Sequence, residues 1–163
     1  MNPKGTKGRI RDLISHSADL LALAEEGLQR LRKMPDDRLT VLSTFVLVNS
    51  IRDWVKTERG LPSYWPQVPY LEAVREVANG TKHLELSPRS HSDPHVQGLS
   101  PWDDIDTIDW DELGNPVPMI TLCVRRAKDE PLRWRSARWV LEEALDGWRA
   151  ELRLPPAGHA RDH

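Results

Sequence analysis

Four side chains within nine residues of the sequence are of the types that bind an anion and move a proton. Arg75, Asn79 and His83 recur at intervals of four residues, and Lys82 precedes the last of them. Side chains four residues apart lie one above the other on a helix, so we expect these groups to form one polar stripe. Histidine exchanges a proton near neutral pH, and arginine or lysine can hold a phosphate. The combination suits cleavage of a phosphodiester without a metal.

The segment from residue 78 to residue 83 reads Ala-Asn-Gly-Thr-Lys-His and falls on the third of four expected helices. It resembles the signature of the HEPN superfamily, in which an arginine and a polar residue are followed by three variable residues and a histidine. The resemblance implies an all-α bundle, often dimeric, and in many members a metal-independent endoribonuclease of a toxin or phage-defence system. It also implies that Asn79 is the polar position and that His83 transfers the proton.

The chain departs from that signature at Ala78, where the family has arginine. A phosphate would therefore have to be held by Lys82 or Arg75. Two functions follow from this. We expect a HEPN-like, non-catalytic interaction or accessory factor of bacterial or phage type, and the alternative is a metal-independent endoribonuclease that uses His83. Neither function needs a metal or another cofactor, and the partners to consider are a second copy, another protein or RNA.

A purely structural role for the same stripe stays open. Lys82 and His83 fall near the end of the expected helix, where positive side chains interact favourably with the helix dipole. Asn79 can bond to neighbouring backbone. Gly80 costs roughly 1 kcal/mol relative to alanine inside a helix, which points to close approach of another helix or a ligand.

Polar side chains also interrupt the apolar second helix, at Asn49, Arg52 and Asp53. Buried charges need partners, so Arg52 and Asp53 should pair or reach the surface. In the functional interpretation they meet the polar stripe. Asp53 would then orient His83, or Arg52 would supply the missing contact to a nucleic-acid phosphate.

Three further groups have weaker claims to a site. A histidine-containing loop and an acidic run resemble metal ligands, but the loop lacks further ligands and the run lacks the spacing of a calcium loop, so we expect no metal. Cys123 reads as a small core residue. Alternating arginines and tryptophans, from Arg133 to Trp139, suit nucleic acid, a protein or dimer contact, or a core edge covered by arginine stems. The histidine-containing loop contains His91, Asp93 and His95. The acidic run contains Asp103, Asp104, Asp106, Asp109, Asp111 and Glu112, and the basic and aromatic segment contains Arg133, Trp134, Arg135, Arg138 and Trp139.

Apolar residues at three- and four-residue steps predict helices that hold these groups in place. The expected helices are 9–33, 37–56, 69–86 and 136–152, capped in two cases by Asp37 and Ser136. Alternating residues at 105–110 and 119–126, around a turn at 114–116, predict a small β-hairpin in a long loop. The fold class is therefore mainly α, a bundle of about four helices. We expect one domain over 1–154 and a flexible tail at 155–163.

The composition of the chain bears on its possible partners and on its cellular compartment. The chain has 163 residues, 39% hydrophobic and 29% charged, with a net charge of -2, so any contact with nucleic acid must be local. A single cysteine favours a reducing compartment, and we expect a cytoplasmic protein. The positive charges at the start have no apolar run behind them, so we expect neither a signal peptide nor a membrane segment.

Overall fold

Four α-helices dominate the part of the chain that the computed structural model describes, which is residues 14–83, 96–100, 109–110, 116–117 and 119–155. For residues 81–83, 96–100, 109–110 and 116–117 it describes the backbone only. The mainly α class with a small hairpin before the last helix is confirmed. The helices are α1 (Ser17–Lys33), α2 (Arg38–Glu58), α3 (Leu71–His83) and α4 (Ala137–Glu151).

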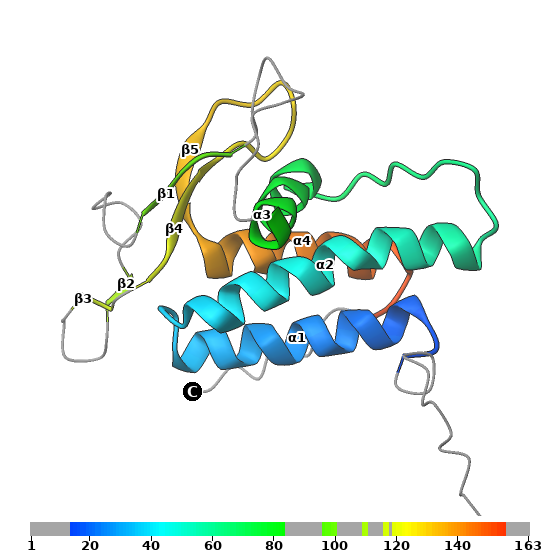
Figure 1. The fold of residues 1–163 in the computed structure, drawn as a ribbon, viewed down its shortest axis with the longest axis horizontal. Coiled ribbons are helices and arrows are strands. Elements are labelled where there is room, and N and C mark those ends of the chain that lie inside the picture. Colours follow the sequence, from blue (N-terminus) through cyan, green and yellow to red (C-terminus); the bar gives the residue numbers. More distant parts are fainter. Residues whose placement is uncertain (1–13, 84–95, 101–108, 111–115, 118, 156–163) are drawn as a thin grey trace, which may run out of the picture.

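Helix α2 lies at the centre of the core, as its nearly all-round apolar sequence predicts. It contacts each of the other three helices. Figure 1 shows α1 and α2 side by side, with the sheet at the end where α4 begins. The α2 residues that are at most 1% exposed are Val41, Thr44, Phe45, Val48, Ile51 and Val55. Leu39 continues the apolar pattern that predicts this core, but it is 78% exposed.

The helix boundaries follow the local capping chemistry. Asp37 caps α2, since its carboxylate accepts hydrogen bonds from the backbone N–H groups of Leu39 and Thr40 at 3.1 and 3.4 Å. Helix α1 begins at Ser17, where the side chain of Asp19 accepts from the backbone N–H of His16 at 2.9 Å. Its expected start at residue 9 lies outside the described residues.

Acid is expected to weaken the start of α2 through Asp37. The hydroxyl and backbone N–H of Thr40 lower the pKa of the Asp37 carboxyl from 3.8, with a smaller contribution from Leu39. Because the pKa is lower in the folded chain, this stabilisation is present above about pH 4 and is lost as pH falls through the folded pKa. Asp37→Ala should therefore lower the urea midpoint at pH 7, by a difference that shrinks below about pH 4.

Urea titrations of the parent and of the variant at several pH values measure this effect. The control is Asp36→Ala, which removes the neighbouring exposed carboxylate that does not precede the helix directly. A gap between parent and Asp37→Ala that stays the same at acid pH would show that the ionised cap is not its source.

The sheet differs from the predicted hairpin in its pairing. A hairpin does form around the expected turn, from β2 (Asp109–Trp110) and β3 (Pro116–Val117). The strand predicted at 119–126 is present as β4 (Thr121–Val124), but its pairing with 105–110 is wrong. Instead β4 is the middle of an antiparallel sheet, between β1 (Val96–Ser100) and β5 (Arg133–Ser136). A central position fits its buried residues, Leu122 and Val124, at 0% and 1% exposed.

Strand β5 leads directly into α4. The hydroxyl of Ser136 accepts from the backbone N–H of Trp139 at 3.1 Å, which confirms the predicted cap. The backbone N–H of Ala137 donates to the carbonyl of Ile120 at 2.8 Å and ties the helix to the start of β4. The buried residues of α4 recur at helical spacing and form its inner face; they are Ala137, Val140, Leu141, Ala144, Leu145 and Trp148.

Candidate functional site

The described part of the α3 stripe faces outward. Asn79 is exposed, and the Arg75 side chain is 25% exposed. The Arg75 guanidinium lies 3.4 Å from the carboxylate of Glu72, one turn earlier in the same helix. The stripe therefore presents an amide and a partly neutralised guanidinium at the surface.

Ala78 lies on the adjacent face of α3, which is buried in the core. It is 0% exposed, as are Ala73 and Val74 on the same inner face. Val74 and Ala78 are four residues apart, so helical spacing places them on one face. The position at which the HEPN signature has arginine is thus occupied here by a small side chain sealed inside the bundle.

Lys82 and His83 belong to the last turn of α3, but their side chains lie outside the described part of the structure. Their roles, and a meeting of His83 with Asp53, stay predictions. The histidine loop at 91–95 lies wholly outside the described residues, and so does most of the acidic run. Within the described residues, no three His, Cys, Asp or Glu side chains cluster in a way that could hold a metal. No described helix is long and apolar enough to span a membrane.

Arg52 binds the loop that leads into α3. Its Nε lies 3.7 Å from the carboxylate of Asp53, and its Cζ lies 5.0 Å from the ring centroid of Trp65. The side chains of Arg52 and Asp53 are 20% and 69% exposed, and Trp65 is 60% exposed. Arg52 therefore supports an exposed tryptophan by a cation–π contact. Its contact with a nucleic acid stays a prediction.

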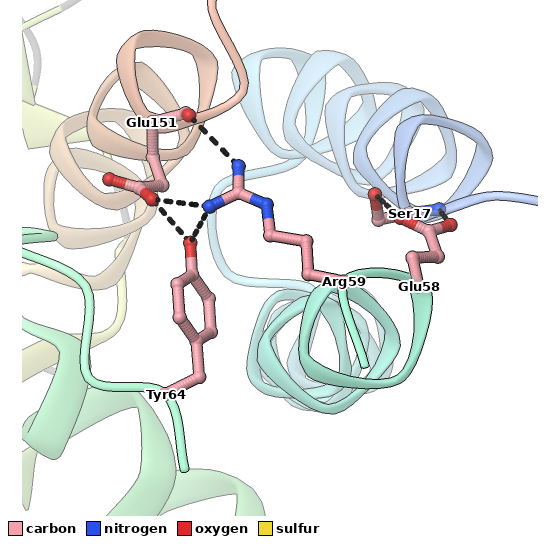
Figure 2. A network of polar contacts seen from close by, with 5 residues as sticks. All are labelled: Ser17, Glu58, Arg59, Tyr64 and Glu151. Carbon is pink, nitrogen blue, oxygen red and sulfur yellow. Dashed lines mark hydrogen bonds and ion pairs between the residues drawn. The ribbon is translucent and has the colours of Figure 1, made fainter. Parts of the chain in front are cut away.

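The same loop is fastened to α4 by a polar network (Figure 2). The hydroxyl of Tyr64 donates to Oε1 of Glu151 at 2.5 Å, and Nη1 of Arg59 donates to the same oxygen at 3.1 Å. Burial and, to a smaller extent, the hydrogen bond to Glu151 raise the pKa of Tyr64. The hydroxyl therefore stays protonated and acts as a donor. The ring of Tyr64 also contacts Trp148, with centroids 6.4 Å apart. This network explains how an irregular segment holds the start of α3 in place.

At the other side of α2, Glu58 joins α2 to α1. It accepts from the backbone N–H and from the hydroxyl of Ser17, each at 2.6 Å (Figure 2). A carboxylate at the first turn of a helix is favoured by the free N–H groups and by the helix dipole. Glu58 therefore has a structural role, and we do not count it among the groups that could bind a ligand.

A second convergence of polar and aromatic groups surrounds Tyr70. Tyr70 precedes α3 directly, is 4% exposed and has a φ of 59°, which is unusual for a bulky residue. Its backbone N–H donates to the carbonyl of Arg126 at 2.9 Å, and its carbonyl accepts from Val74 at 2.8 Å. These bonds hold the strained conformation between α3 and the end of β4. Strain of this kind is concentrated at functional sites, so the surroundings of Tyr70 are a candidate site.

The groups around the Tyr70 ring come from two other elements, β5 and α4. Arg135 of β5 lies close enough to the Tyr70 hydroxyl to lower its pKa. The Cζ of Arg135 lies 4.5 Å from the ring centroid of Trp139, and the Trp139 ring meets Tyr70 edge-on at 6.4 Å. Burial raises the pKa of Tyr70, against the opposing effect of Arg135. The hydroxyl is therefore protonated at neutral pH, and the site offers N–H and O–H donors suited to an anion.

Sequence reasoning found two of the five residues of this cluster. Arg135 and Trp139 belong to the alternating basic and aromatic segment, whereas Tyr70, Arg126 and Glu143 were missed. Arg126 and Glu143 are joined at 3.5 Å from distant parts of the chain. No local spacing signals this meeting, because it depends on the pairing of β4 with β5 and on the docking of α3.

Comparison with known proteins gives no relatives: neither a protein-family model, nor a curated protein, nor a solved structure matches this chain. The resemblance to the HEPN superfamily therefore depends on residues 78–83 and on the order of the helices.

Proposed function

We propose that the protein is a HEPN-like, non-catalytic interaction or accessory factor. The observation that carries this proposal is the complete burial of Ala78, beside the exposed Asn79. An arginine that stabilises a phosphate must reach the substrate, and this position points into the core instead. The arginine of the signature is thus absent from the chain, and its place in the helix is used for packing.

The neighbouring charges support the same proposal. The guanidinium of Arg75 is 3.4 Å from Glu72, so a substrate phosphate would compete with a carboxylate already in place. The guanidinium of Arg52 lies against Trp65. Stabilisation of the charge that develops on a phosphate needs donors aimed at the reacting group in advance. Arg75 and Arg52 instead each have a partner within the chain, Glu72 and Trp65.

The alternative function is a metal-independent endoribonuclease with His83 as general acid and base. It is favoured by the exposure of Asn79, one helical turn before His83 on the same stripe. In this alternative Asn79 positions the substrate, and Lys82 or Arg75 holds the phosphate. A second copy placed across a two-fold axis would bring two such stripes together.

An RNA cleavage assay in EDTA distinguishes the two functions. We expect the purified parent chain and its His83→Ala variant to leave several structured and single-stranded RNAs equally intact, because the buried Ala78 takes the position of the signature arginine. Asp146→Ala, at an exposed position of α4 away from the stripe, is the matched control. Cleavage by the parent that disappears in His83→Ala, with the circular dichroism spectrum unchanged, would overturn the proposed function in favour of the nuclease.

A further inference from the structure

We propose that the surface formed by Arg126, Arg133, Arg135 and Trp139 over Tyr70 binds an acidic segment of a partner protein. We call it the arginine–tryptophan surface. The inference rests on the proposed function as an interaction factor and names the chemical class of its partner.

The sheet register places these residues along one edge. Arg133 and Arg135 are two residues apart on β5, so they project from the same face of the sheet. They pair with Val124 and Leu122 of β4, whose side chains are buried in the core. Both arginines therefore project on the side of the helices, at the edge strand of the sheet, and Arg135 lies against Trp139 at the start of α4.

The local charge is opposite in sign to that of the whole chain. Residues 125–139 contain six arginines and lysines and two acidic residues, although the chain has a net charge of -2. Arg133 is exposed, the Arg126 side chain is 49% exposed, and Trp139 is 38% exposed. A concentrated positive patch on an otherwise acidic protein attracts a complementary negative segment.

Two carboxylates of the chain itself already bind at this surface. Two side chains of the chain itself approach the guanidinium of Arg126, Glu143 at 3.5 Å and Glu130 at 3.8 Å. Arg135 is held by stacking on Trp139 and by its bond to the Trp134 carbonyl at 3.2 Å. A guanidinium fixed in this way loses little freedom when it binds, and its planar group matches a carboxylate in two-point contact. Tryptophan, tyrosine and arginine are also the residues that most often dominate binding between proteins.

The distribution of charge favours a peptide over RNA. A single-stranded nucleic acid needs a positive groove along several phosphates and aromatic faces on which its bases stack. Here Glu130 and Glu143 interrupt the positive charge, and Trp139 is in contact with Arg135 and Tyr70. A short acidic segment needs only the local charge, and its carboxylates can displace those of Glu130 and Glu143.

Fluorescence anisotropy with the full chain tests the proposal. The probe is a fluorescein-labelled peptide of about ten glutamates, compared with a labelled single-stranded RNA of similar charge, at low and at physiological salt. We expect saturable binding of the peptide by the parent and a loss of at least about tenfold in affinity for Arg133→Glu. Arg133 is exposed, so this variant is expected to keep its fold.

The matched control is Arg30→Glu, the same charge reversal at an exposed position of α1. Binding that Arg30→Glu weakens as much as Arg133→Glu would reflect net charge alone and would overturn the site. Absence of saturable peptide binding up to ~1 mM would overturn it as well. Tighter binding of the RNA than of the peptide would replace the protein partner by a nucleic acid. None of these outcomes bears on RNA cleavage, on which the proposed function is tested separately.

Discussion

Ala78→Arg, which restores the arginine of the HEPN signature, is expected to destabilise the protein by about 3–5 kcal/mol instead of creating a nuclease. Ala78 is 0% exposed and packs on the inner face of α3 beside Val74. An arginine at this position must bury its charge without a partner or force α3 away from α2, which it contacts. Both routes cost a large fraction of the stability of a typical domain.

Urea unfolding followed by circular dichroism measures this effect. The matched control is Asn79→Arg, which adds the same side chain one residue later at an exposed position and should change stability by no more than about 0.5 kcal/mol. An Ala78→Arg chain that folds as stably as the control would show that the position opens to solvent. If that chain also cleaved RNA in EDTA while the parent did not, the replacement of the signature arginine by Ala78 would explain why the parent does not cleave RNA.

The helices could be predicted because their determinants are local. Residues three and four apart share a face, so the buried face of α4 and the all-round burial of α2 are written in the spacing of their apolar residues. Asp37 and Ser136 cap the helices that were expected to follow them. The error at Leu39 has a different origin. Its side chain continues the apolar pattern but is 78% exposed, and no local pattern reports which parts of a helix its neighbours cover.

The sheet could be predicted only in part, because strand pairing depends on distant segments. The β-prone residues of β4 were recognised, whereas its partners lie elsewhere in the sequence. Strand β5 has the sequence Arg-Trp-Arg-Ser, in which arginines occupy the positions that pair with Leu122 and Val124. An edge strand tolerates such charged residues, and they hide it from a search for alternating apolar residues.

The candidate sites likewise include residues that could be predicted from local spacing and residues that could not. The outward Asn79 and the inward Ala78 follow from helical spacing, so their opposite environments could be anticipated. The environment of Tyr70 could not. It requires a left-handed backbone conformation at a tyrosine, a hydrogen bond to the Arg126 carbonyl and the register of β5. Each of these is set by tertiary structure that no single segment encodes.

Replacing Trp148 by alanine is expected to cost about 3–5 kcal/mol, because Trp148 is among the largest fully buried side chains of the described core. It lies on α4, which contacts both α1 and α2, and its ring supports Tyr64 of the polar network (Figure 2). Truncation would leave a cavity where these helices meet and would remove the surface on which Tyr64 rests. The loop before α3 should therefore loosen together with the core.

Two substitutions separate burial from the mere loss of an aromatic ring. Trp65→Ala removes a tryptophan that is 60% exposed and should cost less than about 1 kcal/mol. Trp148→Phe keeps most of the volume and also removes an indole N–H that has no hydrogen-bond partner among the described residues. Its cost should accordingly stay below about 1.5 kcal/mol. Equal losses of unfolding free energy for Trp148→Ala and Trp65→Ala in urea would mean that α4 does not close the core as the structure describes. The polar network would then have to support α3 through Arg59 and Glu151 alone.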